Sequence, residues 1–573
     1  MSICKLTKEL NRLRKSSSDS IDNVESFTQF KKYMHVIRKA EEDLRQILHS
    51  VNASGKKTLV LLCGSAGDGK SHLLSYLRNS DDEELLSEYT VYNDATESSA
   101  PSKTAIETLN ELLKDFRDEN LELPGKNIIL AINLGVLSNF VESEFGEQYT
   151  RLKEYVEIHN ILTSKIAKKD FDLNSNFQHV SFSDYHMYSL NENGIKAKYI
   201  EEIMDRVFGD NVGNDFFEAY KSCSTCPLMK KCPVCKNYEY MKDDKRQKFV
   251  AELLVKTTIK NKVILTTREI LNFIYDIIVS KDFSYTKFQK LLVDDAAYIK
   301  EFLRQITPTL LFESSDLTSL MNMVRMYDPL LVRTEEADQI AISYYVSSNV
   351  IEDVKKIFSG TTYGDVVCSS ILFERINGDR TLKGQVFNLM TRVDALESGG
   401  IKDDVYQRYL SDLYLYNSGK GKKLGSLYSM VKKSVIQWCG SDTEGNICID
   451  DGRRGFALFE DIEFKESLEL MPEMDNSEEL QRFVPYLVVT YKTNDAKFIS
   501  LDIDFSMYEL LHKLTLGYVQ TADDRNNHAD FISFIERILQ TGNQENEVSV
   551  VSNNGKRAMV SKNTFGYTFK VVK

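Results

Sequence analysis

Apolar residues along the chain follow two different periods, and the change of period marks its regions. Within residues 1–55, Phe30, Met34 and Ile37 recur at the spacing of a helix that buries one face. Residues 58–63 are almost all apolar, a glycine-rich segment follows, and residues 71–78 return to helical spacing. The pattern predicts an N-terminal helical region and then a buried strand, a turn and a helix.

Three further apolar runs alternate with helical segments. Residues 88–92, 127–132 and 178–183 have the length and apolar character of strands, and a helical segment at 196–222 follows them. Strands that are apolar on both faces and alternate with helices are typical of a parallel sheet covered on both sides. This part of the chain therefore predicts an α/β fold with a parallel sheet.

The second half of the chain has a different pattern of predicted secondary structure. Residues 266–435 are mainly helical, with helices expected at 268–279, 296–310, 365–376 and 405–416. Short strands dominate from about residue 440, and Asn554-Gly555 between two partly apolar runs predicts a β-hairpin. We expect four regions: a helical region at 1–55, an α/β core at 56–260, a helical lid and middle region at 261–435, and an α/β C-terminal domain at 436–573.

The glycine-rich segment at 64–71 matches the full phosphate-binding pattern G-x-x-x-x-G-K-[ST]. Glycines let successive N–H groups face inward around phosphate oxygens, and the following helix adds the positive end of its dipole. Lys70 is the expected catalytic contact to the β- and γ-phosphates, and Ser71 is the expected Mg²⁺ ligand. The alternative is a glycine turn without a ligand. The predicted ATP-binding residues are Gly64, Ser65, Ala66, Gly67, Asp68, Gly69, Lys70 and Ser71.

Hydrolysis needs a carboxylate near the metal, and the sequence lacks one at the expected position. The 127–132 strand is the expected Walker-B strand, but it ends at Asn133, and an amide can contact metal-bound water without acting as a base. We therefore add Asn133 to the nucleotide contacts. Asp94 and Glu97, after the 88–92 strand, are the candidate catalytic carboxylates, since neighbouring strand tips share one crevice. The alternative is that Asp94 caps a turn.

A second basic candidate is Arg268. Thr266 and Glu269 have the spacing of a capping box at the start of an apolar helix. Arg268 lies in the first turn, where its charge opposes the helix dipole, so it is expected to face an anion. A γ-phosphate and a surface ion pair are the two alternatives.

Four cysteines cluster within thirteen residues in the spacing C-x2-C-x5-C-x2-C. Paired C-x-x-C turns suit a tetrahedral metal, so a structural Zn²⁺ is the first hypothesis. An iron–sulfur cluster also takes four cysteines, and free thiols are the remaining alternative. The proposed ligands, inserted in the α/β core, are Cys223, Cys226, Cys232 and Cys235. The other cysteines (Cys4, Cys63, Cys368, Cys439 and Cys448) are scattered, as expected of reduced cytosolic thiols.

Charge and hydropathy narrow the functional classes. Lys and Arg number 72 and Asp and Glu number 85, which gives a net charge of −13. A strongly basic DNA-binding chain is excluded, so DNA contact must be local or through a partner. The sequence shows no secretory signal and no run of about 18 apolar residues. We expect a cytoplasmic protein with no membrane contact.

The ordered set of motifs resembles one family. Residues 61–72, 92–98 and 131–135, the four cysteines and residues 266–276 are similar to the DptF family, the P-loop subunits of the bacterial restriction system that depends on DNA phosphorothioation. The resemblance extends over the whole chain and is strongest between residues 58 and 280. It implies an AAA+-like P-loop NTPase fold and anti-phage defence against DNA that lacks the phosphorothioate modification. DptG- and DptH-like subunits are the implied partners.

Two functions remain as alternatives at this stage. The first is an ATPase or ATP switch within a DNA restriction complex, and the second is an assembly scaffold that binds ATP without hydrolysing it. A small-molecule kinase is a third and weaker alternative. No set of Asp, Glu and Lys residues indicates a nuclease, and homo-oligomerisation is left open.

Overall fold

The computed structural model describes most of the chain. The described residues are 4–18, 29–65, 67–79, 83–93, 104–163, 166, 171–172, 174–314, 316–346, 350–376, 378–400, 402–442, 445–450, 455–493, 497–541 and 547–572. The chain forms two compact units. The first contains residues 1–189 and 196–402, and the second contains residues 190–195 and 403–573.

A four-stranded parallel sheet organises the first part of unit 1. Its strands are β1 (Leu59–Cys63), β2 (Tyr89–Tyr92), β3 (Asn127–Ile132) and β4 (Phe177–Ser181). The order is β2-β3-β1-β4, and the three neighbouring pairs are parallel. All five residues of β1 are buried. This confirms the predicted α/β fold with a parallel sheet. Strands that are apolar on both faces are stable only between two layers of helices.

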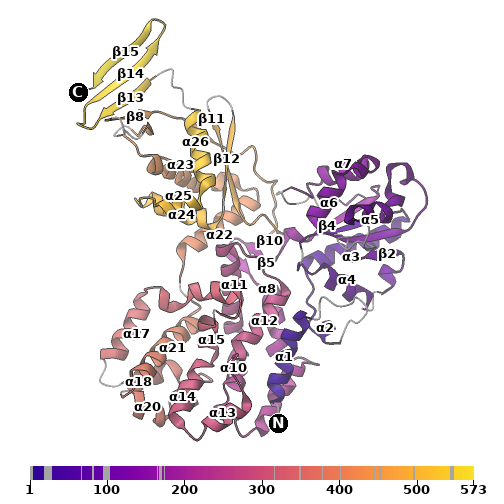
Figure 1. Cartoon of the computed structure of the whole chain (residues 1–573), viewed down its shortest axis with the longest axis vertical. Coiled ribbons are helices and arrows are strands. Elements are labelled where there is room, and N and C mark those ends of the chain that lie inside the picture. Colours follow the sequence, from indigo (N-terminus) through magenta and orange to yellow (C-terminus); the bar gives the residue numbers. More distant parts are fainter. Residues whose placement is uncertain are drawn as a thin grey trace. The chain divides into compact units, whose positions relative to one another are not determined.

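Helices cover both faces of this sheet, as Figure 1 shows. Alternate residues of β1 point to opposite sides: Leu59 and Leu61 join one core cluster, while Val60 and Leu62 join another. The first cluster includes residues of α5 (Ala105–Leu112), α6 (Leu134–Val141) and α7 (Thr150–Ile158). The second includes residues of α3 (Lys39–Ser54) and α4 (Lys70–Arg78). Burial on both sides leaves only the strand ends accessible to a ligand.

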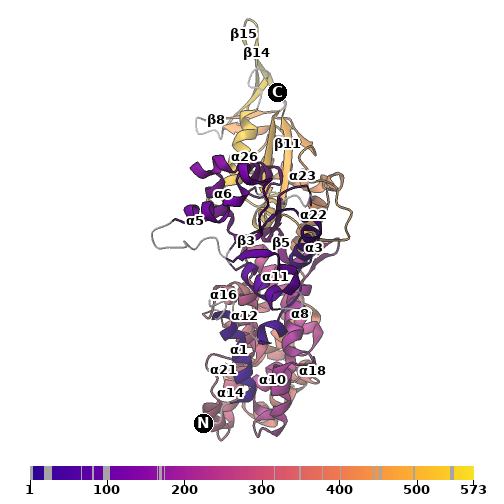
Figure 2. The ribbon, with the colours of Figure 1, turned by 90° about the vertical axis from the view of Figure 1, so that its right-hand side faces the viewer.

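Helices make up the rest of unit 1. The main ones are α8 (Lys198–Phe208), α9 (Asp215–Lys221), α10 (Pro233–Met241), α11 (Asp244–Asn261), α12 (Thr267–Ile278), α14 (Asp295–Arg304), α15 (Thr307–Glu313) and α21 (Arg380–Ser398). The helix α1 (Lys5–Ser18) packs against α9 and α12 and runs beside α12 in Figures 1 and 2. The single helix predicted at 296–310 is wrong: two helices form there, and Pro308 lies in the first turn of the second. The helix predicted at 365–376 is also divided, into α19 (Gly364–Val367) and α20 (Ser370–Ile376).

Unit 2 combines helices with antiparallel sheets. One sheet has the order β12-β11-β9, and a five-stranded sheet has the order β15-β14-β13-β8-β7. Their bounds are β7 (Ile447–Asp450), β8 (Phe456–Glu460), β9 (Phe464–Ser467), β11 (Leu487–Thr493), β12 (Phe498–Ile503), β13 (Glu547–Ser552), β14 (Arg557–Asn563) and β15 (Gly566–Val572). The helices are α22 (Asp404–Asn417), α23 (Gly425–Cys439), α24 (Phe505–Thr515), α25 (Ala522–Asn527) and α26 (Ala529–Gln540). The predicted hairpin at Asn554-Gly555 is confirmed, since it joins the antiparallel pair β13 and β14.

Among the residues whose positions are described, no helix is both long and apolar enough to cross a bilayer.

Candidate nucleotide site and cysteine pocket

The glycine-rich segment at residues 64–71, the candidate phosphate loop, begins at the carboxyl end of β1, a central strand of the parallel sheet. The N–H of Gly64 donates to the carbonyl of Ile132 at 3.2 Å, which places the loop beside the end of β3. A Cβ at Gly64 would lie 2.9 Å from Cβ of Phe182, the residue that follows β4. The loop is therefore enclosed by the tips of both neighbouring strands, and only glycine fits at its first position.

Lys70 and Ser71 open α4 directly after this loop. The ammonium of Lys70 donates to the carbonyl of Ser65 at 2.6 Å, so its charge lies over the loop itself. Gly69 is the N-cap of α4 and has no side chain to accept from the first-turn N–H groups. Ser71 is exposed in that first turn. An anion at this point would meet backbone N–H donors, the helix dipole and one ammonium group. Ala66 lies outside the described residues.

Asp68 places a carboxylate inside the same loop. Its Oδ2 accepts from the N–H of Ser65 at 2.5 Å. Burial raises the pKa of Asp68, while Lys70, the Ser65 hydrogen bond and Arg38 act in the opposite direction. A negative charge in an anion-binding loop weakens the positive potential of the loop. An anion at this loop would therefore also meet the Asp68 carboxylate.

Arg38 is a contact of the loop that the sequence analysis missed. It precedes α3 and donates from Nη1 to the Asp68 carbonyl at 2.7 Å and from Nη2 to the Tyr185 carbonyl at 2.9 Å. Its guanidinium also lies 5.6 Å from the centre of the Tyr199 ring. Arg38 thus supports the loop and brings a second positive charge to it. No local motif marks this arginine, because its partners are distant in sequence.

The strand ends carry the candidate acids. Asn133 is the N-cap of α6, and its Oδ1 accepts from the N–H of Gly135 at 2.8 Å. It therefore lies beside the loop as expected, with its amide oxygen engaged in a helix cap. Asp94 and Glu97 lie outside the described residues, and β2, which precedes them, is separated from β1 by β3.

Asp184 is a carboxylate near the loop that the sequence analysis missed. It ends the short turn Phe182–Asp184 that follows β4, the neighbour of β1 on the other side. Burial raises the pKa of Cys63 to about 12, with Lys70 opposing the shift and Asp184 adding to it. Lys70 and Asp184 thus both act on the residue that immediately precedes the loop. A carboxylate directly after an expected strand was the available signal.

The start of α12 borders the loop from the other side. The predicted capping box is confirmed: the Glu269 carboxylate accepts from the N–H of Thr266 at 2.8 Å, and the N–H of Glu269 donates to the Thr266 hydroxyl at 3.2 Å. A Cβ at Gly67, whose φ is +91°, would lie 3.0 Å from Cγ2 of Thr266. Arg268 is exposed in this first turn. Its contact with a γ-phosphate stays a prediction.

The four clustered cysteines line one small cavity. Cys223 lies in the turn Ser222–Thr225, Cys226 follows that turn, Cys232 is the N-cap of α10, and Cys235 lies in the first turn of α10. Their common cavity has a volume of about 10 Å³ and is also lined by Cys4 and Tyr285. This is room for one atom of water size. The four cysteines of the predicted site thus line one cavity, and metal binding there stays a prediction.

The thiols interact with one another. The neighbouring Cys235 thiol lowers the pKa of Cys223, while Cys223 together with burial raises the pKa of Cys235. Burial raises the pKa of Cys232 to about 12, and the nearby Cys4 and Cys223 add to this. Sγ of Cys226 lies 4.0 Å from the Tyr285 hydroxyl. In the described part of the chain, no group of three or more His, Cys, Asp or Glu side chains already stands in metal-binding geometry.

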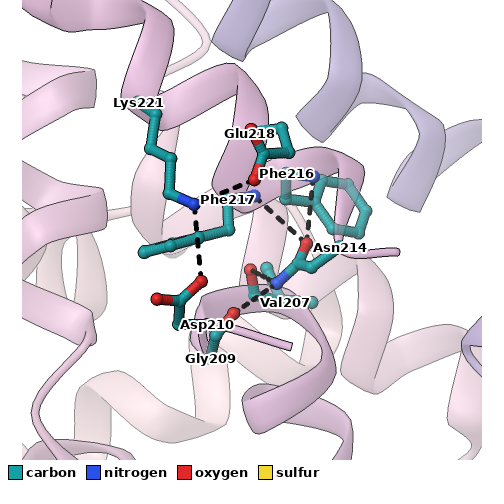
Figure 3. A network of polar contacts seen from close by, with 8 residues as sticks. All are labelled: Val207, Gly209, Asp210, Asn214, Phe216, Phe217, Glu218 and Lys221. Carbon is teal, nitrogen blue, oxygen red and sulfur yellow. Dashed lines mark hydrogen bonds and ion pairs between the residues drawn. The ribbon is translucent and has the colours of Figure 1, made fainter. Parts of the chain in front are cut away.

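A buried asparagine, Asn214, fixes the corner between α8 and α9, the helix that leads to this pocket (Figure 3). The Asn214 amide donates to the carbonyls of Val207 at 3.2 Å and Gly209 at 2.7 Å, and its oxygen accepts from the N–H groups of Phe216 and Phe217. The first pair of bonds closes the end of α8, and the second caps α9. Asn214 therefore sets the direction of α9, which ends at Lys221 beside Cys223.

Comparisons with family models, with curated proteins and with solved structures found no match to this chain. What the nucleotide site can do therefore follows from its own residues. Its backbone N–H groups, Lys70 and Arg38 are groups that an anion could contact, and the Ser71 hydroxyl and nearby carboxylates are of the kind that a hard cation prefers.

Proposed function

We propose that this chain binds ATP with Mg²⁺ at residues 64–71 and hydrolyses it as a subunit of a bacterial anti-phage restriction complex. One observation supports the nucleotide part: the segment with the full G-x-x-x-x-G-K-[ST] pattern follows the carboxyl end of a central parallel strand and leads directly into a helix. Ligands of α/β sheets bind outside the carboxyl ends of the strands. The loop therefore has the sequence and the position that phosphate binding needs.

The loop residues have distinct roles in this proposal. Lys70 exchanges its bond to the Ser65 carbonyl for the β- and γ-phosphates, and the Ser71 hydroxyl ligates Mg²⁺. Arg38 and the start of α12 lie on the borders of the loop, so Arg38 and Arg268 are the candidate contacts for charge on the terminal phosphate.

Hydrolysis requires a carboxylate that positions the metal or the attacking water. Asp184 is a described candidate because it lies near Cys63, and Asp94 and Glu97 are the candidates from sequence. One observation favours the alternative function, a scaffold that binds ATP without hydrolysing it. Asn133 stands at the tip of β3, where an acid is expected, and its amide oxygen is used as a helix cap.

Two measurements test the ATP proposal. We expect Mg·ATP to bind the full chain in calorimetry and Lys70→Ala to weaken it at least a hundredfold, while Lys153→Ala, an exposed lysine on α7, leaves it unchanged. Equal affinity in Lys70→Ala and the wild type would contradict ATP binding at this loop. Steady-state turnover of Asp184→Asn, Asp94→Asn and Glu97→Gln then separates the ATPase from the scaffold. Bound nucleotide that is never turned over by the wild type supports the scaffold.

The role in restriction rests on the resemblance of the ordered motifs to the DptF family. The proposed partners are DptG- and DptH-like subunits, and the proposed target is DNA without phosphorothioate modification. Co-purification of tagged chain with the products of neighbouring genes, followed by ATPase assays with modified and unmodified DNA, tests this part. A chain that purifies alone, with ATP turnover indifferent to DNA, contradicts it.

The cysteine pocket completes the proposal as a structural metal site. Four thiols around one cavity are the donor set of a tetrahedral Zn²⁺, which would fasten the Ser222–Thr225 turn to α10. A cavity of about 10 Å³ suits a single ion better than a multi-atom iron–sulfur cluster, which stays the alternative. Zinc supplies only a fixed cross-link here. Metal analysis with an absorption spectrum distinguishes the two, because Zn²⁺ has no visible absorption.

A further inference from the structure

A fifth thiol reaches the cysteine pocket from a distant part of the chain. Cys4 lines the same cavity as Cys223, Cys226, Cys232 and Cys235, although 219 positions separate it from the first of them. The sequence analysis grouped Cys4 with the scattered cysteines. Only the docking of α1 on the helical part of unit 1 brings the Cys4 sulfur to the two C-x-x-C turns.

The docking of α1 is specific along its length. Leu6, Leu10 and Leu13 are fully buried along one face of the helix. At the end far from Cys4, Nη2 of Arg14 contacts the buried Asp276 carboxylate of α12 at 2.5 Å. An apolar face and an ion pair thus hold the helix in one register, and Cys4 is presented to the pocket as a consequence.

The five thiols are not equivalent. Cys223, Cys232 and Cys235 are buried, whereas Cys4 and Cys226 are half-buried. Of the last two, Cys226 shares a hydrogen bond with the Tyr285 hydroxyl, with 4.0 Å between Sγ and the hydroxyl oxygen. A tetrahedral site uses four ligands, so one of the five thiols is surplus.

We propose that Cys4 is a ligand of the metal in this pocket, together with Cys223, Cys232 and Cys235, and that Cys226 is the thiol left over. This inference rests on the proposed metal site. Its consequence is that a single divalent cation of the Zn²⁺ class ties α1 to the C-x-x-C turns. Metal binding then contributes directly to the docking of α1, because the ligands come from two segments distant in sequence.

The test compares cysteine variants of the full chain. We expect about one Zn²⁺ per wild-type chain, at least tenfold weaker retention against a chelator in Cys4→Ser and Cys223→Ser, and near wild-type retention in Cys226→Ser. Substitution with Co²⁺ adds a spectroscopic readout, since the loss of a thiolate ligand reduces the sulfur-to-cobalt charge-transfer absorption. Circular dichroism of each variant verifies that it is folded.

Hydrogen exchange supplies the second readout. Chelation should raise amide exchange across α1 in the wild type and Cys226→Ser, whereas α1 of Cys4→Ser should already exchange faster with zinc present. Lys8→Ala, on the exposed face of α1, is the matched control: it should keep both the metal and the protection of α1. If the wild type binds zinc, Cys4→Ser retains it as well as the wild type and Cys226→Ser loses it, the role of Cys4 is overturned while the metal site stands. Wild type that binds no metal overturns the metal site as well.

Discussion

At the scale of single residues, the phosphate loop contains charges of both signs. Lys70 and Arg38 supply positive charge, and Asp68 places a carboxylate on the N–H of Ser65, a donor that phosphate also needs. Burial raises the pKa of Asp68, because it disfavours the ionised carboxylate. A bound triphosphate adds negative charge and disfavours the ionised form further. Asp68 is thus expected to limit affinity for ATP.

Removing this charge should strengthen binding. We expect Asp68→Asn to bind Mg·ATP about tenfold more tightly, on the order of 1.4 kcal/mol, because the amide keeps the shape without the charge. In the wild type, ATP binding favours protonated Asp68, so affinity should fall as pH rises through the raised pKa of Asp68 and then level off.

The comparison of the two proteins by calorimetry across pH isolates this effect. The titration of ATP itself is common to both, so only the difference between them reports on Asp68. Identical pH profiles, or weaker binding in Asp68→Asn, would show that the carboxylate does not oppose the ligand.

At the scale of elements, single side chains fix how helices and strands meet. Asn214 joins α8 to α9 with four hydrogen bonds and is 1% exposed. Gly67 lets the loop approach Thr266 at the start of α12. In both cases a small polar or absent side chain permits a close approach that a larger one would prevent. These contacts orient the helices that carry Cys223 and Arg268.

The Asn214 corner gives a stability prediction. Asn214→Ala leaves buried donors and acceptors unpaired, and we expect it to lower the free energy of unfolding by about 2–3 kcal/mol. Lys221→Ala, which removes exposed ion pairs to Asp210 and Glu218 and an exposed cation–π contact with Phe217, should change it little. Denaturant titration followed by circular dichroism measures both. Equal effects of the two substitutions would contradict the assignment of the corner to Asn214.

At the scale of the whole molecule, the chain forms two compact units, and its net charge is −13. Binding to DNA depends mainly on phosphate neutralisation, which an acidic chain opposes. We therefore expect the isolated chain to show no measurable affinity for duplex DNA at about 150 mM salt, and affinity to emerge when partner subunits are added. Fluorescence anisotropy with labelled DNA tests this. Tight, salt-sensitive binding by the chain alone would show a basic surface that the net charge conceals.

The sequence by itself determined those features that depend on neighbouring residues. The apolar run at 127–132 identified β3, and Thr266 with Glu269 identified a helix start. Glycine spacing and Lys70-Ser71 identified the turn between β1 and α4, whose phosphate binding stays a prediction. Each is set by local backbone geometry and hydrogen bonding, which short-range patterns encode. Helix breaks were less certain, because tertiary packing determines whether a helix continues past a weak position such as residue 305.

The tertiary structure alone decided which distant residues meet. Arg38, Asp184 and Thr266 converge on the loop, and Cys4 converges on the clustered cysteines, from positions that no local pattern links. Sheet order placed β3 between β1 and β2, so Asn133 adjoins the loop and the strand before Asp94 does not. Packing of buried faces brings these segments together, because the apolar area that they remove from water depends on the whole fold and not on sequence separation.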